Sequence, residues 1–165
     1  MKKFVWLMML MALLLSGCQS VPTFETLGNV YAPQPEPDRQ KIQLILPQEA
    51  SAQTVVGIQG TIYFCDGYEI VVETFSAGDL SSTVRSLTGF DAEALTVMQT
   101  KRDGYNCYEC AWTSAGETGF QTGRTKIIDD GAWHYSLTVL APSETAGQLQ
   151  DQWQQLFESF GLAQS

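Results

Sequence analysis

The stretch that decides the fold is residues 129–160, DDGAWHYSLTVLAPSETAGQLQDQWQQLFESF, because it holds a turn, a strand and a helix in one run. Asp129-Asp130-Gly131 is typical of a tight turn, and the aromatic and β-branched residues from Ala132 to Leu140 predict a strand. Ser143 can cap the helix that follows, with Glu144 near its positive end and Gly161 as its C-cap. An apolar stripe at helical spacing predicts that this helix packs on a sheet: Leu149, Trp153, Leu156, Phe157 and Phe160.

Upstream of this stretch, short strand-like segments alternate with turn residues. We expect strands over residues 41–46, 54–65, 68–75, 95–101, 105–113 and 120–128, and a loop over residues 114–119. Asp66-Gly67 and Arg102-Asp103-Gly104 are typical hairpin turns. One short helix is expected after residues 76–79, ending at Gly89, because Leu80, Val84 and Leu87 share one helical face. Strands joined by such short turns favour an α+β fold, an antiparallel β-sheet packed by helices.

The segment from Asp130 to Val139, followed by a helix that ends in Glu158-Ser159-Phe160, resembles the PsbP-like superfamily. The resemblance follows the order of the elements over roughly residues 41–162 and is concentrated after Asp129. It implies an α/β/α sandwich that serves as a binding or assembly scaffold. It carries no shared catalytic residue over to this chain.

The N-terminus has the parts of a bacterial lipoprotein signal. Lys2 and Lys3 precede an apolar run of twelve residues, Phe4 to Leu15. This run is shorter than the ~20 residues that a membrane span needs, and it fits a signal peptide. Leu15-Ser16-Gly17-Cys18 resembles a lipobox, which implies diacylglyceryl transfer to the Cys18 sulfur and cleavage after Gly17. We therefore expect residues 1–17 to be a signal peptide and Cys18 to carry palmitate-like acyl chains.

Acyl chains on Cys18 would anchor the protein on the extracytoplasmic face of the cell membrane. Gln19, rather than Asp, follows the lipidated residue, so a diderm bacterium could transfer the protein to its outer membrane. Residues 18–40 contain Pro33, Pro35 and Pro37 and predict a disordered, extended linker. A single α+β domain is expected over residues 41–165.

The charge balance excludes nucleic acid as a partner. The chain has 9 Lys and Arg against 18 Asp and Glu, a net charge of −9. Loss of Lys2 and Lys3 with the signal leaves 7 − 18 = −11, a field that repels phosphate backbones. The membrane is therefore reached through the lipid anchor rather than through charge. The further partner, a protein or a small molecule, is not specified by the sequence.

Three cysteines remain besides Cys18. Cys107 and Cys110 have the Cys-x-x-Cys spacing of redox and zinc motifs, but their aromatic neighbours predict a strand, on which residues three apart point to opposite faces. Two alternatives stay open. One is a structural disulfide from Cys65 to Cys107 or Cys110, and the other is a set of small buried thiols.

No catalytic residue, metal site or cofactor is predicted. His134 is the only histidine and lies in a predicted strand without a patterned nucleophile nearby. Asp129-Asp130 lacks the spacing of a calcium loop, and Glu69 and Glu73 offer oxygen ligands without a recognisable loop around them. The sequence thus favours a non-enzymatic, membrane-anchored binding or envelope-accessory domain. The alternative is a structural subunit of a larger envelope complex.

Overall fold

The computed structural model describes residues 37–53, 60–117 and 119–163. Its contacts divide the chain into one unit of residues 1–36 and another of residues 37–165. The predicted signal peptide, Cys18 and most of the predicted linker lie outside the described residues. Pro37 and Gln40, which the sequence assigns to the linker, already contact the domain: Trp133 Nε1 donates to Pro37 O at 3.0 Å, and Gln40 N donates to Tyr135 Oη at 2.8 Å.

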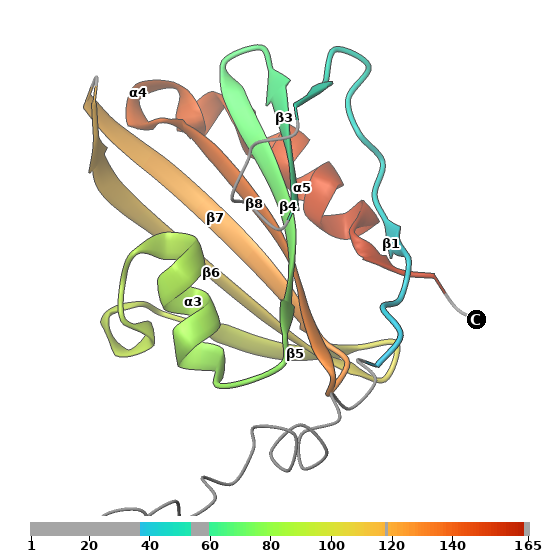
Figure 1. The fold of residues 1–165 in the computed structure, drawn as a ribbon. Coiled ribbons are helices and arrows are strands. Elements are labelled where there is room, and N and C mark those ends of the chain that lie inside the picture. Colours follow the sequence, from blue (N-terminus) through green and yellow to red (C-terminus); the bar gives the residue numbers. More distant parts are fainter. Residues whose placement is uncertain (1–36, 54–59, 118, 164–165) are drawn as a thin grey trace, which may run out of the picture. The chain divides into compact units, whose positions relative to one another are not determined.

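A seven-stranded antiparallel sheet forms the body of the domain (Figure 1). In spatial order its strands are β2 (Ser51–Gln53), β3 (Gly60–Cys65), β4 (Tyr68–Ser76), β8 (Trp133–Pro142), β7 (Gly119–Asp129), β6 (Tyr105–Gly116) and β5 (Met98–Arg102). Short turns join β3 to β4 and β5 to β6, with Gly67 at φ 81° and Gly104 at φ 89°. The last long strand, β8, therefore lies in the middle of the sheet, between β4 and β7.

Helices cover both faces of this sheet. His134 and Tyr135 are consecutive in β8 and so point to opposite faces. Tyr135 belongs to the core under α5 (Gln150–Ser159), while His134 bonds Thr83 of α3 (Leu80–Thr88). The sheet thus lies between α3 and α5, which is the α/β/α arrangement that the sequence predicts (Figure 1). Within the described ranges, no helix has the length and hydropathy that crossing a membrane requires.

The main core lies between α5 and the sheet. Ile70 of β4 and three residues of β8, Tyr135, Leu137 and Val139, are fully buried there. The apolar stripe of α5 packs against them through Trp153, Leu156, Phe157 and Phe160, with Leu149 partly buried at its start. Burial of one such large side chain contributes about 1.5–3 kcal/mol, so this interface stabilises the domain and fixes the position of α5.

The short helix α3 forms as the sequence predicts. Asp79 caps its N-terminus by accepting from Ser81 N and Ser82 N, both at 3.3 Å. Gly89 ends it in the left-handed conformation, φ 77°, and its N–H donates to Arg85 O. Val84 is fully buried and presses α3 onto the sheet.

The first predicted strand is shorter than expected. Only Ile42–Gln43 form a strand, β1, and it pairs with β9 (Gly161–Leu162) rather than with the main sheet. The reason is packing, because Ile42, Leu44 and Leu46 lie partly buried against the core under α5. Of the predicted strand over residues 54–65, only the part from Gly60 lies among the described residues.

Three other strand boundaries differ clearly from the prediction. Strand β6 runs on to Gly116 and β7 begins at Gly119, so the expected loop is a tight hairpin. Strand β5 begins at Met98, after the short helix η1 (Ala92–Ala94).

The C-terminal helix also begins and ends differently. Ser143 is the first residue of α4 (Ser143–Ala146) rather than a cap, and its Oγ lies 2.9 Å from Thr122 Oγ1. The turn η2 (Gly147–Leu149) joins α4 to α5, and Phe160 ends α5 because Gly161 enters β9.

Candidate functional site

Two hollows flank α5, and together they are the candidate functional site. The first, called here the apolar groove, has a volume of about 640 Å³ and lies between the segment Ile45–Glu49 and α5. Its apolar lining consists of Ile45, Leu46, Pro47 and Leu156. Its polar lining consists of Glu49, Tyr68, Gln152, Gln155, Glu158 and Ser159.

Tyr68 lines this groove, and its hydroxyl is buried beside the thiol of Cys65 without a closer hydrogen-bond partner among the described residues. Tyr68 is 4% exposed. Burial raises its pKa far above the ordinary value, and Cys65, through its charge and a weak hydrogen bond with the phenol, and then Glu49 raise it further. The phenol therefore stays protonated and keeps its O–H donor, with the weak acceptor Cys65 beside it.

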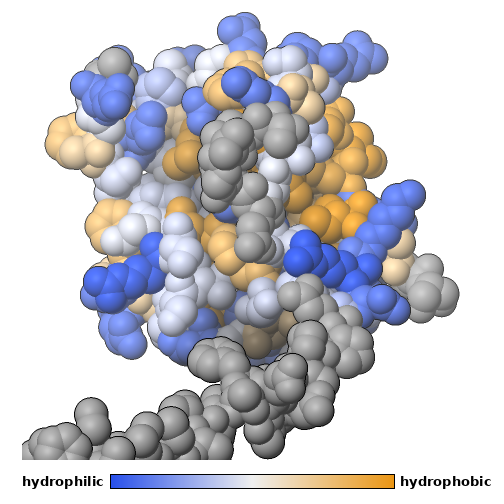
Figure 2. Space-filling model, viewed as in Figure 1, coloured by the Kyte–Doolittle hydropathy of each residue, from blue (hydrophilic) through white to orange (hydrophobic). Residues whose placement is uncertain are grey.

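The edge of the groove that Ile45 forms is apolar, and hydrogen bonds hold it in place. Ile45 is 76% exposed. Its backbone N–H donates to Ser159 Oγ at 3.1 Å, and that hydroxyl donates to Leu156 O at 2.9 Å. The segment is thus tied to the end of α5. In Figure 2 hydrophobic residues gather on the side where this segment and α5 lie in Figure 1.

The ionisable residues that line the apolar groove favour a neutral or basic ligand. Besides Tyr68 they are Glu49 and Glu158, both carboxylates. In the described part of the groove no lysine or arginine balances them. An anionic group would therefore be repelled here.

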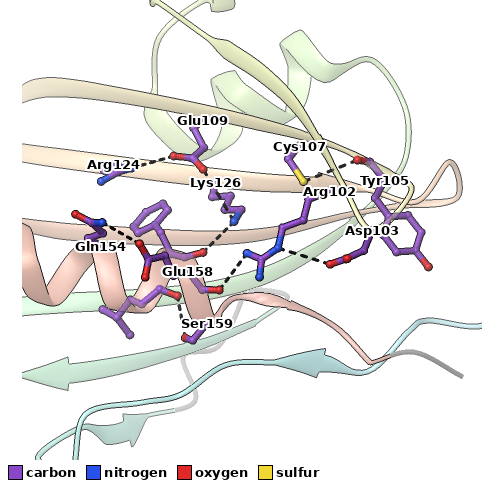
Figure 3. A network of polar contacts seen from close by, with 12 residues as sticks. Arg102, Asp103, Tyr105, Cys107, Glu109, Arg124, Lys126, Gln154, Glu158 and Ser159 are labelled. Carbon is purple, nitrogen blue, oxygen red and sulfur yellow. Dashed lines mark hydrogen bonds and ion pairs between the residues drawn. The ribbon is translucent and has the colours of Figure 1, made fainter.

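The second hollow, called here the basic pocket, has a volume of about 470 Å³ and lies on the other flank of α5. Four cationic residues line it, Lys101 and Arg102 of β5 and Arg124 and Lys126 of β7, together with Glu109 of β6. Figure 3 shows Arg102, Arg124, Lys126 and Glu109. Strands β5, β6 and β7 are neighbours in the sheet, so their register brings together residues that are far apart in the sequence.

Two of these cations hold the end of α5. Lys126 Nζ donates to Phe157 O at 2.9 Å, and Arg102 Nη1 donates to Glu158 O at 3.0 Å. The last carbonyls of a helix lack partners within the helix and form its negative end. Positive donors from the sheet therefore satisfy them and orient α5 over the sheet.

The remaining contacts of the pocket centre on Glu109. Arg124 Nη2 donates to Glu109 Oε2 at 3.0 Å, and the guanidinium lies 4.5 Å from the centre of the Phe157 ring. Lys126 Nζ is 4.0 Å from Glu109 Oε1. Burial lowers the pKa of Lys126; Glu109 opposes this shift, while Arg102 and Arg124 add to it.

The sheet does not bring Cys65 together with either candidate partner. Cys65 lies in β3 and Cys107 and Cys110 lie in β6, with β4, β8 and β7 between them. Four strand spacings amount to about 19 Å, whereas a disulfide joins Cα atoms about 4.4–6.8 Å apart. All three are free thiols, and Cys107 and Cys110 are buried, on opposite faces of β6 by strand alternation.

His134 has a structural contact rather than a catalytic setting. It is 2% exposed, and its Nδ1 lies 2.8 Å from Thr83 Oγ1, while its Nε2 is 3.9 Å from Asp129 Oδ1. This order of groups is that of a catalytic triad, but Thr83 is 6% exposed and lies between α3 and the sheet. A substrate has no access to a nucleophile buried there.

The acidic residues considered as metal ligands have structural positions, in a turn and in the sheet. Asp130 Oδ1 accepts from Ala132 N at 2.9 Å and from Trp133 N at 2.7 Å, which is the turn chemistry that the sequence predicts. Glu69 and Glu73 lie on one face of β4 by strand alternation. Across the residues that the structure describes, no three His, Cys, Asp or Glu side chains form a group that could hold a metal ion.

Sequence reasoning missed both hollows. Tyr68 is predicted as a strand residue, but its lack of a partner depends on packing by α5 and residues 45–49. The basic pocket depends on the register of three strands. One local signal could have found it: Lys126 lies in the otherwise apolar and hydroxyl-bearing run Thr125 to Ile128, where a buried lysine needs a partner.

No model of a known family and no curated protein sequence matches the chain. The cyanobacterial PsbP (CyanoP) of Synechocystis sp. PCC 6803 is similar in structure, with a TM-score of 0.58 and 9% identity over 74% of this chain and 86% of that one. LpqN of Mycobacterium tuberculosis, described as involved in cell envelope biogenesis, has a TM-score of 0.52 and 12% identity over 79% and 88% of the two chains. A structure from Bacteroides thetaiotaomicron also has a TM-score of 0.52, at 8% identity, over 75% of this chain and 46% of that one. The chain therefore has a PsbP-like fold.

Proposed function

We propose that this chain is a lipid-anchored extracytoplasmic lipoprotein whose domain binds a segment of a partner protein through the apolar groove, without catalysis. The lipobox ending at Cys18 supports the anchor. The PsbP-like fold, and the likeness to an envelope-biogenesis protein of Mycobacterium tuberculosis, support an accessory role in the envelope.

The observation that carries the binding role is the buried hydroxyl of Tyr68 at the groove. A buried polar group without a partner destabilises a protein by about 1–3 kcal/mol. Because the hydroxyl is fully buried, a ligand has to part the side chains over it; a carbonyl oxygen that then reaches it would accept this hydrogen bond and remove the penalty. Such an unused donor beside an apolar lip is the pattern of a binding site.

A peptide segment fits the rest of the lining. Leu46, Pro47 and Leu156 offer an apolar surface for a side chain, and Ile45 extends that surface beyond the groove. The exposed amides of Gln152 and Gln155 can both donate to and accept from a peptide backbone. Because Glu49 and Glu158 repel anions, the segment is neutral or basic.

Site-specific photocrosslinking in the native envelope tests this proposal. A benzoylphenylalanine at Gln152 lies at the groove, and one at Ser86, which is exposed on α3, lies on the other side of the sheet. We expect the Gln152 position to form one protein adduct of defined mass, and the Ser86 position to form none. A Tyr68→Phe change in the same background should reduce the adduct yield several-fold.

Two outcomes would count against the groove. The absence of any protein adduct at Gln152 would overturn binding of a protein segment there. Equal adducts from Gln152 and Ser86 would indicate a chain surrounded on several faces, as a structural subunit of a larger envelope complex would be.

A further inference from the structure

We propose that residues 44–49, called here the lid, move away from the body of the domain and so admit a ligand to the buried hydroxyl of Tyr68. This inference rests on the proposed function, because it concerns access to the apolar groove. It makes binding there conditional on a local opening of the fold.

The first argument is the position of the lid beside the phenol. Tyr68 lines the groove, but its hydroxyl is fully buried, so a ligand in the groove does not reach it while the lid is closed. The carboxylate of Glu49, at the end of the lid, lies close enough to raise the pKa of both Tyr68 and Cys65. Most of the lid lines the same groove, through Ile45, Leu46, Pro47 and Glu49. The other wall of the groove is α5.

The second argument is that α5 is firmly held and cannot open the groove. Its side chains Trp153, Leu156 and Phe157 are buried in the main core. Its last carbonyls accept from the sheet, Phe157 O from Lys126 Nζ and Glu158 O from Arg102 Nη1. Movement of α5 would disrupt both sets of contacts, so the lid is the wall that moves.

The third argument is that the lid is weakly held. Among the residues that the structure describes, one hydrogen bond joins it to another part of the domain, and this bond from Ile45 N to Ser159 Oγ is exposed to water. Leu44 and Leu46 are only partly buried, and Ile45 is 76% exposed. Few buried apolar contacts and exposed hydrogen bonds are the marks of a segment that opens at a small fraction of the cost of unfolding.

The fourth argument is that the chain is fixed on both sides of the lid. Before it, β1 pairs with β9, and Ala163 N donates to Lys41 O at 2.8 Å. After it, Ala50 N donates to Pro47 O at 3.2 Å, and β2 then pairs with β3. The lid can therefore move as a loop between two anchored strands, and the main sheet stays intact.

Acetylation of tyrosine hydroxyls by N-acetylimidazole tests the lid in the full lipidated chain, purified in detergent. Peptide mass spectrometry gives the initial rate at each tyrosine, divided by its rate in the urea-unfolded chain. Tyr135 is the internal reference, since it is 0% exposed and its hydroxyl donates to Asp130 at 3.0 Å. We expect Tyr68 to react at least tenfold faster than Tyr135, because lid opening uncovers Tyr68 alone.

Two variants loosen the lid. Ser159→Ala removes the acceptor of Ile45 N and should speed acetylation of Tyr68 about two- to tenfold, the effect of one hydrogen bond. Leu46→Ala removes a partly buried contact of the lid and should speed it several-fold. Neither change should alter the rate at Tyr135.

Each variant has a matched control. The hydroxyl of Ser86 also donates to its own helix, to Ser82 O at 2.9 Å, but it lies on α3 across the sheet. Leu149 is partly buried against the same core as Leu46, but it lies before α5 and does not line the groove. Ser86→Ala and Leu149→Ala should both leave acetylation of Tyr68 unchanged.

Two results would overturn the lid. Equal rates at Tyr68 and Tyr135 would mean that the phenol is reached only through wider unfolding. Equal acceleration by Leu149→Ala and Leu46→Ala would assign the motion to α5.

The photocrosslinking experiment separates this proposal from the proposed function. A protein adduct at Gln152 in a chain whose Tyr68 reacts no faster than Tyr135 would retain the partner and overturn the lid. Fast acetylation of Tyr68 without any adduct at Gln152 would support the lid and count against the partner. With both in place, Ser159→Ala should raise the adduct yield, because a larger fraction of molecules is open to the partner.

Discussion

At the scale of single residues, burial sets the reactivity of the cysteine thiols. Burial raises the pKa of Cys65, Cys107 and Cys110, which lowers the fraction of reactive thiolate. Cys107 and Cys110 are also 2% and 5% exposed, whereas Cys65 is half-buried. We expect iodoacetamide to modify Cys65 first in the folded protein and to reach the other two only after unfolding.

Peptide mass spectrometry after timed alkylation measures this order. Unfolding without a reductant should then yield all three modified cysteines. Recovery of only one modified cysteine, with the other two linked, would show that the disulfide expected from the sequence forms and would contradict the separation of β3 from β6.

Glu73 gives a pH-dependent prediction at the same scale. Burial raises the pKa of Glu73 above 4.5. At pH values between 4.5 and the raised pKa, the Glu73 carboxyl therefore keeps its proton in the folded state and has lost it in the unfolded state. The unfolding free energy decreases as the pH rises through this interval. Glu73→Gln removes this charge and should stabilise the protein at pH 7 by about 1 kcal/mol or less.

Urea denaturation at a series of pH values checks the prediction. The gain in Glu73→Gln should disappear at a pH below 4.5, where both states hold the proton. Glu93→Gln, at an exposed position in η1, is the control and should stay within about 0.5 kcal/mol at every pH. A gain that is the same at low and neutral pH would rule out charge burial as its cause.

Individual residues also mark the limit of sequence reasoning about the site. The strand position of Tyr68 follows from its pattern, because Tyr68, Ile70 and Val72 alternate with polar residues. That its hydroxyl lacks a partner follows from the segment Ile45–Glu49 and α5, which are distant in sequence. A single sequence carries no signal for that contact.

At the scale of elements, the β6–β7 hairpin depends on a glycine opposite a tryptophan. Gly123 of β7 pairs with Trp112 of β6, and a Cβ built on Gly123 would lie 2.4 Å from Trp112 Cζ2. Trp112 is buried, so the ring cannot easily move aside. Gly123→Ala should therefore lower the unfolding free energy by about 1–3 kcal/mol.

Gly147 provides the matched control. It has helical φ of −63°, and an added Cβ meets no atom within 4 Å. Gly147→Ala should be neutral or stabilise the protein by about 0.4–1 kcal/mol, since it restricts the unfolded chain. Guanidinium denaturation of both variants decides the point, and equal destabilisation would mean that Trp112 is not the cause.

The elements themselves were largely predictable, because their signals are local. The stripe of α5, the cap at Asp79 and the turn at Asp66-Gly67 each lie within one stretch of sequence. Pairing between distant segments was not predictable, and β1 is the example. Alternation at Ile42, Leu44 and Leu46 resembles a sheet strand, but their partner is the core beside α5 and the short strand β9.

At the scale of the whole molecule, the prediction concerns the anchor. Cys18→Ser should leave the precursor uncleaved or release the protein from the membrane, because acyl chains contribute about 0.8 kcal/mol for each buried methylene. Membrane fractionation and mass analysis of the N-terminus measure both effects. Cys65→Ser is the control and should remain in the membrane fraction. Recovery of Cys18→Ser in acylated form at the membrane would exclude Cys18 as the lipidated residue.

Net charge is informative at this scale but hides local structure. A net charge of −9 disfavours nucleic acid as a partner, yet four cations line one pocket of the same molecule. Composition averages over the surface, whereas the register of β5, β6 and β7 gathers those cations at one place. Only the folded arrangement separates the two hollows beside α5.

Strand β5 has a consequence for crowding in a membrane plane. It ends the order of the sheet, and all five of its residues are exposed. An exposed edge strand of this kind can pair with the edge strand of another copy. The tendency is strongest when copies held at a membrane, as proposed here, diffuse in two dimensions. Lys101 and Arg102 place positive charge on strand β5 of every copy, so the β5 strands of two copies repel each other. With the proposed anchor on Cys18, many copies would therefore share one bilayer without forming lateral fibres.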